Sequence, residues 1–249
     1  MNHTPENNDI IFGRNPVREA LLSGREIDSL LVARGERQGS VRVIIEMCRE
    51  KGVPVRDVAP IKLDSLCPGG SHQGVAAYVA AHEYSSVDDI FALAASRGEP
   101  PLIVLCDGLS DPHNLGAVIR TCDAAGDHGV IIPKRRAAGL TWAVDKASAG
   151  ALEYVPVARV TNLTSCISEL KEKGVWVCAA DMDGQPMVKS DMTGPLAIVI
   201  GGEDGGISRL VRESCDFAVA IPMRGRINSL NASCACAVML YEAIRQRSS

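Results

Sequence analysis

Three polar segments in the last two thirds of the chain have the residue types that a ligand site needs. Each follows a short apolar run, which predicts a loop at the end of a buried strand. The segments are residues 107–114, 201–206 and 222–231. Ligands of α/β proteins bind where the carboxyl ends of parallel strands meet, and glycine lets a ligand approach the backbone closely. This pattern alone predicts an α/β enzyme or binder of an adenosine-like ligand, and no more.

Arg120 is a candidate for holding an anion, because a guanidinium binds phosphate or carboxylate through two hydrogen bonds. The helix around it has a predicted core stripe of Leu115, Val118, Ile119, Cys122 and Ala125. At about 100° per residue, Arg120 projects from the opposite side, near the face of His113. An ordinary solvated arginine is the alternative, and spacing alone favours it.

The nine cysteines and five histidines do not have metal-ligand spacing. Cys234 and Cys236 are the only close pair, and residues two apart on a helix point to roughly opposite faces, so they cannot share a metal. We therefore expect reduced thiols in a cytoplasmic protein without a metal. No nucleophile elbow or phosphate-binding P-loop occurs. His72 with Gln73 is either a ligand contact or the polar tip of a turn.

The composition restricts the class of protein. A length of 249 residues suits one large or two ordinary domains, and 46% hydrophobic residues suit packed cores. No apolar run is long enough for a membrane span, and residues 1–9 read as a short floppy leader rather than a signal peptide. The formal net charge of −4 argues against a generic nucleic-acid coat protein, but not against an RNA enzyme with a local basic face.

The residue pattern in the first third of the chain predicts a small α/β sandwich in which strands and helices alternate. Strands are expected at 27–33, 53–58 and 75–81. Asn15 is expected to cap a first helix that Gly24 ends, and Ser40 to cap a second. The buried face of the second helix is predicted to be Val41, Ile44, Ile45 and Cys48. A shift to polar composition then predicts a first domain at 1–82 and a linker at 83–100.

The remainder, 101–249, alternates strand and helix at a spacing that predicts a parallel sheet covered on both faces. Its strands are expected at 102–106, 129–133, 154–158, 175–179, 195–200 and 217–221. The last helix is expected to begin at Ser229. Its predicted core stripe is Leu230, Cys234, Ala237, Val238 and Tyr241.

Three motifs, taken in order, resemble those of the SpoU/TrmH family of RNA ribose 2′-O-methyltransferases, in the SPOUT superfamily. They are DPHNLGAVIRT at 111–121, IGGEDGGI at 200–207 and IPMRGRINSLN at 221–231. Any one is weak, but the three together are specific, and the match covers 101–249. The first domain resembles the ribosomal-protein-like RNA-binding module of the branch that methylates a guanosine in 23S rRNA, with similarity at 12–17 and 72–74.

The resemblance implies a C-terminal domain threaded into a trefoil knot, a homodimer, and S-adenosylmethionine as cofactor. By this resemblance, the residues expected to bind the cofactor are Gly201, Ile221, Pro222, Met223 and Leu230. The residues expected to act in RNA binding and catalysis are Asn114, Arg120, Glu203, Ser229 and Asn231. The implied reaction methylates the ribose 2′-OH of a guanosine in 23S rRNA, in the cytoplasm, with no DNA or membrane partner.

The chain departs from the family at three positions of the second motif. The family often has Ser, Gly and Lys where this chain has Gly202, Asp204 and Gly205. The change removes a positive charge and adds a negative one near the expected RNA path, which bears on the substrate and not on the cofactor.

Three alternatives stay open. A tRNA is the rival substrate, although the extra first domain favours rRNA. A non-catalytic RNA-binding protein of ribosome assembly is another, against which the presence of Arg120, Ser229 and Asn231 speaks. A nicotinamide-dependent oxidoreductase would need a glycine-rich first turn and an acidic residue about twenty residues further on, and the first strand of 101–249 has neither.

Overall fold

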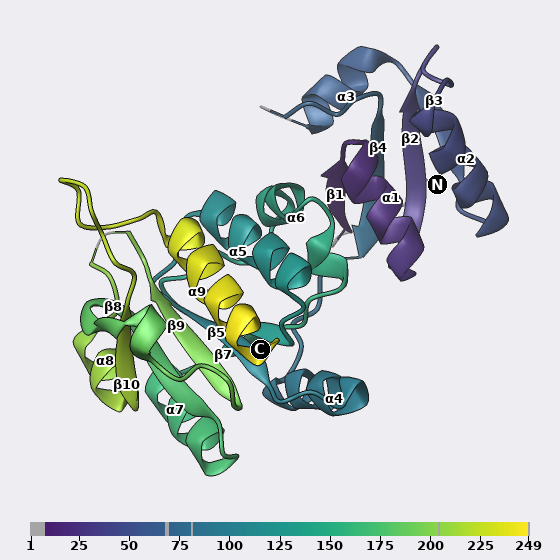
Figure 1. Cartoon of the computed structure of the whole chain (residues 1–249). Coiled ribbons are helices and arrows are strands. Elements are labelled where there is room, and N and C mark those ends of the chain that lie inside the picture. The colour runs from purple at the N-terminus through teal and green to yellow at the C-terminus, as the bar shows by residue number, and fades with distance from the viewer. Residues whose placement is uncertain (1–7, 68–69, 81, 204, 249) are drawn as a thin grey trace. The chain divides into compact units, whose positions relative to one another are not determined.

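The computed structural model describes residues 8–67, 70–80, 82–203 and 205–248, and the chain folds into two compact units (Figure 1). The first unit combines the residues up to Glu83 with Leu140–Tyr154, and the second combines Tyr84–Gly139 with the residues from Val155 onward. The domain limits expected from the sequence stay a prediction, because these units follow packing rather than chain order. Within the described ranges, no helix is long and apolar enough to cross a membrane.

A four-stranded sheet forms the centre of the first unit. Its order is β1 (Asn8–Phe12), β4 (Val75–Ala80), β2 (Ile27–Ala33) and β3 (Val55–Val58). β4 runs antiparallel to β1 and β2, and β3 runs parallel to β2. The unit also contains helices α1 (Arg14–Ser23), α2 (Ser40–Glu50), α3 (Pro60–Leu66) and α6 (Trp142–Ser148), and the 3-10 turn η1 (Ala151–Glu153).

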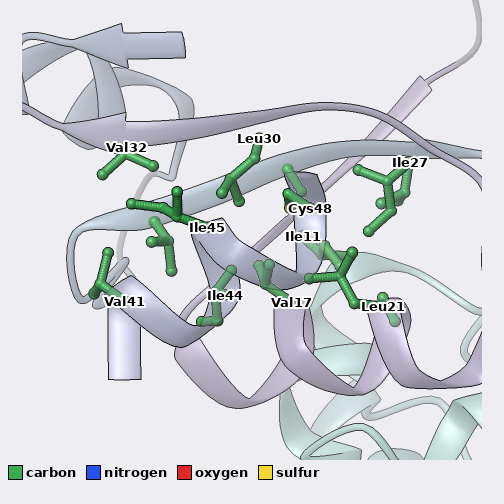
Figure 2. Packing of buried hydrophobic residues seen from close by; sticks show 14 residues of the cluster. Ile11, Val17, Leu21, Ile27, Leu30, Val32, Val41, Ile44, Ile45 and Cys48 are labelled. Carbon is green, nitrogen blue, oxygen red and sulfur yellow. The ribbon is translucent and has the colours of Figure 1, made fainter. Parts of the chain in front are cut away.

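Apolar side chains alternate along β2 and so fill a core on each face of this sheet. Leu30 and Val32 pack with α1 and α2 (Figure 2). Leu31 and Ala33 face the other way and pack with Leu63 of α3. The predicted buried face of α2 is confirmed as Val41, Ile44, Ile45 and Cys48. Since burying one large aliphatic side chain stabilises a fold by about 1.5–3 kcal/mol, these two layers are the main source of stability of the unit.

The two predicted helix caps are wrong. α1 begins at Arg14 after Gly13, and α2 begins at Ser40 after Gly39, so neither Asn15 nor Ser40 is the capping residue. The backbone N–H of Arg14 instead donates to Gln73 Oε1 at 3.1 Å, across 59 positions of the chain. A long-range contact therefore replaces the local cap. β1 also begins inside the predicted leader 1–9, of which residues 1–7 lie outside the described part.

A six-stranded sheet forms the centre of the second unit, and its strand pairs are parallel. The order is β10 (Phe217–Ala220), β8 (Trp176–Pro186), β9 (Leu196–Gly201), β5 (Leu102–Asp107), β6 (Gly129–Pro133) and β7 (Val157–Val160). β7 starts three residues later than expected, whereas β6 has its expected bounds. The predicted fold class, a small α/β sandwich followed by a parallel-sheet α/β domain, is confirmed.

Helices cover both faces of the six-stranded sheet. α5 (Pro112–Ala125) and α9 (Ala232–Arg247) pack together on one face (Figure 1). The core of the other face is shared by α4 (Val87–Arg97), α7 (Leu163–Glu172) and α8 (Arg209–Ser214). The chain leaves β10 at the edge of the sheet and returns to pack α9 against β9 and α5.

The predicted core stripe of α9 is wrong. Leu230 and Tyr241 are 41% and 52% exposed, and Cys234 is exposed as well. The helix begins at Ala232, capped by Asn231, and not at Ser229. Its buried apolar residues are Ala232, Cys236, Met239, Leu240 and Ala243. Apolar residues occur on more than one face of α9, so periodicity alone does not select the face that meets the sheet.

Asp127 is a buried acid between α5 and β6. Its side chain is 2% exposed, and within the described residues neither carboxyl oxygen has a hydrogen bond of normal geometry. Burial raises its pKa to about 8, although the nearby Cys122 thiol and Gly129 amide favour the charged form. The carboxyl group is therefore mostly protonated at neutral pH.

The Asp127→Asn variant should lose less folding stability than wild type as the pH rises. Above pH 4 the unfolded chain loses this proton while the folded chain keeps it up to about pH 8, so stability falls across that window. The asparagine variant should gain stability relative to wild type between pH 5 and pH 8, by on the order of 4 kcal/mol at most. Thermal melts of both proteins at the two pH values measure this. If the stability difference between the two proteins is the same at both pH values, Asp127 is ionised in the folded state.

Candidate active site

The loops after β5 and β9 meet at the carboxyl edge of the parallel sheet. Asp107 and Gly201 are paired at the ends of these strands. The Gly202 N–H donates to the Asp107 carbonyl oxygen at 2.8 Å, and the Ser208 N–H donates to Asp107 Oδ2 at 2.7 Å. Asp107 thus holds both ends of the glycine-rich loop 202–208. Sequence analysis missed this role, although an acidic residue directly after a buried strand was a usable signal.

Two positions of this loop have no room for a side chain. A Cβ atom on Gly201 would lie 2.2 Å from the Gly206 carbonyl carbon, and one on Gly202 would lie 2.2 Å from the Gly108 carbonyl oxygen. Only glycine permits this approach of backbone to backbone. Gly202 is one of the three departures from the family pattern, and the close approach of Gly108 explains why this chain needs glycine there. Asp204, another departure, lies outside the described residues.

Asn114, Glu203 and Asn231 come together from the three sequence motifs. Glu203 Oε1 accepts hydrogen bonds from Asn114 Nδ2 at 2.5 Å and from Asn231 Nδ2 at 3.2 Å. Asn231 Nδ2 also donates to Asn114 Oδ1 at 2.9 Å. We call these three side chains the amide–carboxylate network. It joins the first turn of α5, the loop after β9 and the start of α9.

The helix α9 fixes the orientation of Asn231. Its Oδ1 accepts from the Ser233 N–H at 2.9 Å and from the Ser233 hydroxyl at 2.6 Å, with the Cys234 N–H at 3.4 Å. Because this oxygen caps the helix, the Nδ2 group must face Glu203 and Asn114. A helix cap and a site residue are therefore the same side chain.

A cavity of about 570 Å³ lies beside the network, a volume typical of small-molecule sites. Of the residues proposed for the cofactor, Gly201, Ile221, Met223 and Leu230 line it, as do Glu203 and Ser229. Pro222 is not one of the described lining residues. The cavity thus combines exposed backbone at the glycines with apolar side chains, which suits a nucleoside with an aliphatic extension.

The charges around the cavity are negative. Asp181, Asp183 and Glu203 line it, and its described lining contains no lysine or arginine. The sequence analysis missed Asp181 and Asp183, which extend β8 beyond its apolar part. Their position after an apolar run was the available signal. Arg212 Nε donates to Asp181 Oδ2 at 3.0 Å, so Asp183 and Glu203 are the carboxylates that favour a cationic ligand here. S-adenosylmethionine carries a sulfonium and an ammonium group, so the residues present fit this cofactor.

Arg120 is not among the described residues that line the cavity. It lies on the exposed face of α5, six residues and roughly 9 Å of helix beyond Asn114, and His113 is exposed too. Within the described residues its guanidinium makes no ion pair. Arg120 is therefore available to a ligand that extends beyond the cavity, as an RNA backbone would.

Comparison with known proteins agrees with this geometry. Residues 101–241 match the model of the SpoU rRNA Methylase family, and residues 10–85 match a model described as RNA 2′-O ribose methyltransferase substrate binding. A putative TrmH family tRNA/rRNA methyltransferase from Bacillus subtilis is 45% identical over 243 residues, which cover 97% of each chain.

Two solved structures extend over nearly the whole chain. The SpoU methyltransferase AviRb from Streptomyces viridochromogenes, in complex with AdoMet, has a TM-score of 0.85 at 28% identity, covering 100% of this chain and 95% of that chain. An AdoMet-bound rRNA methyltransferase from Sinorhizobium meliloti has a TM-score of 0.79 at 26% identity, covering 96% of this chain and 87% of that chain.

Proposed function

Because the chain belongs to the SpoU family and is an S-adenosylmethionine-dependent RNA ribose 2′-O-methyltransferase, we propose that its substrate is a guanosine ribose in 23S rRNA. The observation that carries this proposal is the amide–carboxylate network, which places residues from all three motifs beside a cavity fit for the cofactor. The substrate-binding match at 10–85 supports an RNA substrate, for which the first unit would supply a binding surface. We propose the cytoplasm as its location.

The cofactor supplies an electrophilic methyl group when bound. The exposed backbone at Gly201 and the apolar side chains of Ile221, Met223 and Leu230 would hold its adenosine part. Pro222 lies between Ile221 and Met223 in the sequence, and its fixed backbone angle would help to place these two side chains at the cavity. Asp183 would stabilise positive charge in the same cavity, whereas Asp181 is paired with Arg212.

Arg120 has the task of placing the ribose. A guanidinium is protonated at any working pH, so it does not act as a general base. It holds the phosphate next to the target nucleotide, which orients the 2′-OH for in-line attack. The hydroxyl proton leaves to a phosphate oxygen or to water. The network of Asn114, Glu203 and Asn231, with the Ser229 hydroxyl, orients the nucleoside.

We propose further that the protein is a homodimer. Tyr241 and Cys234 are exposed on the face of α9 opposite to its core. Apolar residues gathered on one helix face favour burial against a partner. A second copy of the chain fits, because a two-fold interface places the same face on both subunits. Light scattering that gave a monomer mass at micromolar concentration would contradict this.

Methyl transfer from labelled S-adenosylmethionine tests the substrate. Unmodified 23S rRNA and bulk tRNA are offered separately, and the labelled nucleoside is identified after digestion. The expected product is 2′-O-methylguanosine in the rRNA only. Label in tRNA alone would replace the proposed substrate by the rival one. Cofactor binding without label in either RNA would favour a non-catalytic role in ribosome assembly.

A further inference from the structure

Trp142 and Lys146 form an exposed aromatic and cationic pair on the first unit. Trp142 is 38% exposed, and its ring centroid lies 4.9 Å from that of Phe12, with 38° between the ring planes. Phe12 is only 4% exposed, so it is a fixed support for the indole. Lys146 Nζ lies 5.3 Å from the centroid of Phe12 and 5.9 Å from that of Trp142.

We propose that this pair, which we call the stacking site, binds an unpaired nucleobase of the RNA substrate, with Lys146 contacting an adjacent phosphate. The proposal rests on the proposed function only in taking RNA as the substrate, and it holds for rRNA or tRNA. Phe12 belongs to the substrate-binding match at 10–85, whereas Trp142 and Lys146 belong to the methyltransferase match at 101–241. The methyltransferase segment thus contributes to the RNA-binding unit.

A buried ionic cluster holds the segment Leu140–Tyr154 in the first unit. Arg25 Nη1 lies 3.1 Å from Asp145 Oδ2 and 3.0 Å from Glu153 Oε1, and both carboxylates are almost fully buried. Glu153 also accepts from the Ser23 hydroxyl at 2.9 Å. Removing one partner from such a cluster leaves an uncompensated buried charge. The cluster therefore fixes α6, and with it the position of Trp142.

The same cluster is not a metal site. His82, Asp145 and Glu153 have ligand atoms close enough for one ion. The Arg25 guanidinium, however, is also 2.6 Å from His82 Nε2, so a cation already lies among the three side chains. His82 Nε2 also lies 3.2 Å from Glu153 Oε1.

The chemistry of the pair fits a nucleobase. Trp142 and Lys146 are one helical turn apart, so they lie on one face of α6 while Val144, Asp145 and Ser148 are buried. Lys146 makes no ion pair among the described residues, so its charge is available to a phosphate. Every base has a flat π-face that can cover an exposed indole, and such stacking depends little on base identity.

Tryptophan fluorescence tests the stacking site directly, since Trp142 and Trp176 are the only tryptophans of the chain. Trp176→Phe, an exposed change at the start of β8, leaves Trp142 as the only reporter. Saturating RNA that wild type methylates should quench its emission, because stacking on a base quenches indole. Heparin, a polyanion without bases, should not. Equal quenching by heparin, or none by RNA, would overturn the proposal.

Substitution gives an independent measure. Trp142→Ala should weaken RNA binding roughly tenfold, the order expected for one stacked base, while S-adenosylmethionine binding stays unchanged. Trp142→Phe should retain most of the affinity, which separates stacking from loss of folding. Lys146→Gln should weaken binding less and reduce its salt dependence. RNA affinity unchanged in a folded Trp142→Ala protein would contradict the stacking site, even if the 23S rRNA substrate is confirmed.

Discussion

Arg120→Ala is expected to abolish methyl transfer while leaving S-adenosylmethionine binding nearly intact. The side chain is exposed on α5 and lies outside the described cavity lining, so its removal does not change the walls that hold the cofactor. The loss in kcat should be at least ~100-fold, the order found when one preorganised group that positions or stabilises charge is removed. Single-turnover methyl transfer and calorimetry with the cofactor measure the two effects separately.

Arg120→Lys is the matched control for this prediction. It keeps the positive charge but loses the planar fork that binds a phosphate through two hydrogen bonds. Partial activity in the lysine variant would show that charge contributes beside geometry. An alanine variant that loses cofactor binding as strongly as turnover would place Arg120 in the cofactor site and remove the proposed phosphate role.

Gly201→Ala is expected to remove cofactor binding and to destabilise the second unit. The added methyl group would meet the backbone of Gly206 and the Ile207 nitrogen at 2.2 and 2.4 Å, so the loop 202–208 must move. Overpacking of this kind costs about 1–3 kcal/mol. Because the loop lines the cavity, we expect the dissociation constant of S-adenosylmethionine to rise more than tenfold in calorimetry.

Gly205→Ala tests whether the effect comes from the steric contact. Gly205 lies in the same loop and lines the same cavity, but a Cβ atom there meets no atom within 4 Å and its backbone is not left-handed. We therefore expect a small change in cofactor affinity and in melting temperature. A loss as large as that of Gly201→Ala would mean that the loop needs glycine for flexibility rather than for close approach.

Local patterns predicted most of the strands and helices. β2 and β6 have their predicted bounds, and the buried face of α2 is the predicted one. These successes have a simple cause, because a strand or helix with a single apolar face has only one way to bury it. α9 lacks this property, and the prediction of its core face failed for that reason.

The candidate site was predicted less completely. The three motifs are visible along the chain, and they identified Asn114, Glu203 and Asn231 as polar site residues. No local pattern shows that the three side chains bond to one another, or that Asn231 orients itself by capping α9. The carboxylates of Asp181 and Asp183 became part of the site only because β8 extends past its apolar residues to the cavity.

Element types, the two-part α/β class and the family resemblance follow from residue order, because periodicity and motifs are properties of neighbouring residues. Three features needed the folded chain: the buried face of α9, the packing of Leu140–Tyr154 with the first unit, and the amide–carboxylate network. Each depends on contacts between distant positions; Glu203 and Asn231 reach Asn114 across 89 and 117 residues. Such contacts form only where the strand order brings loop ends together, and local sequence does not encode that order.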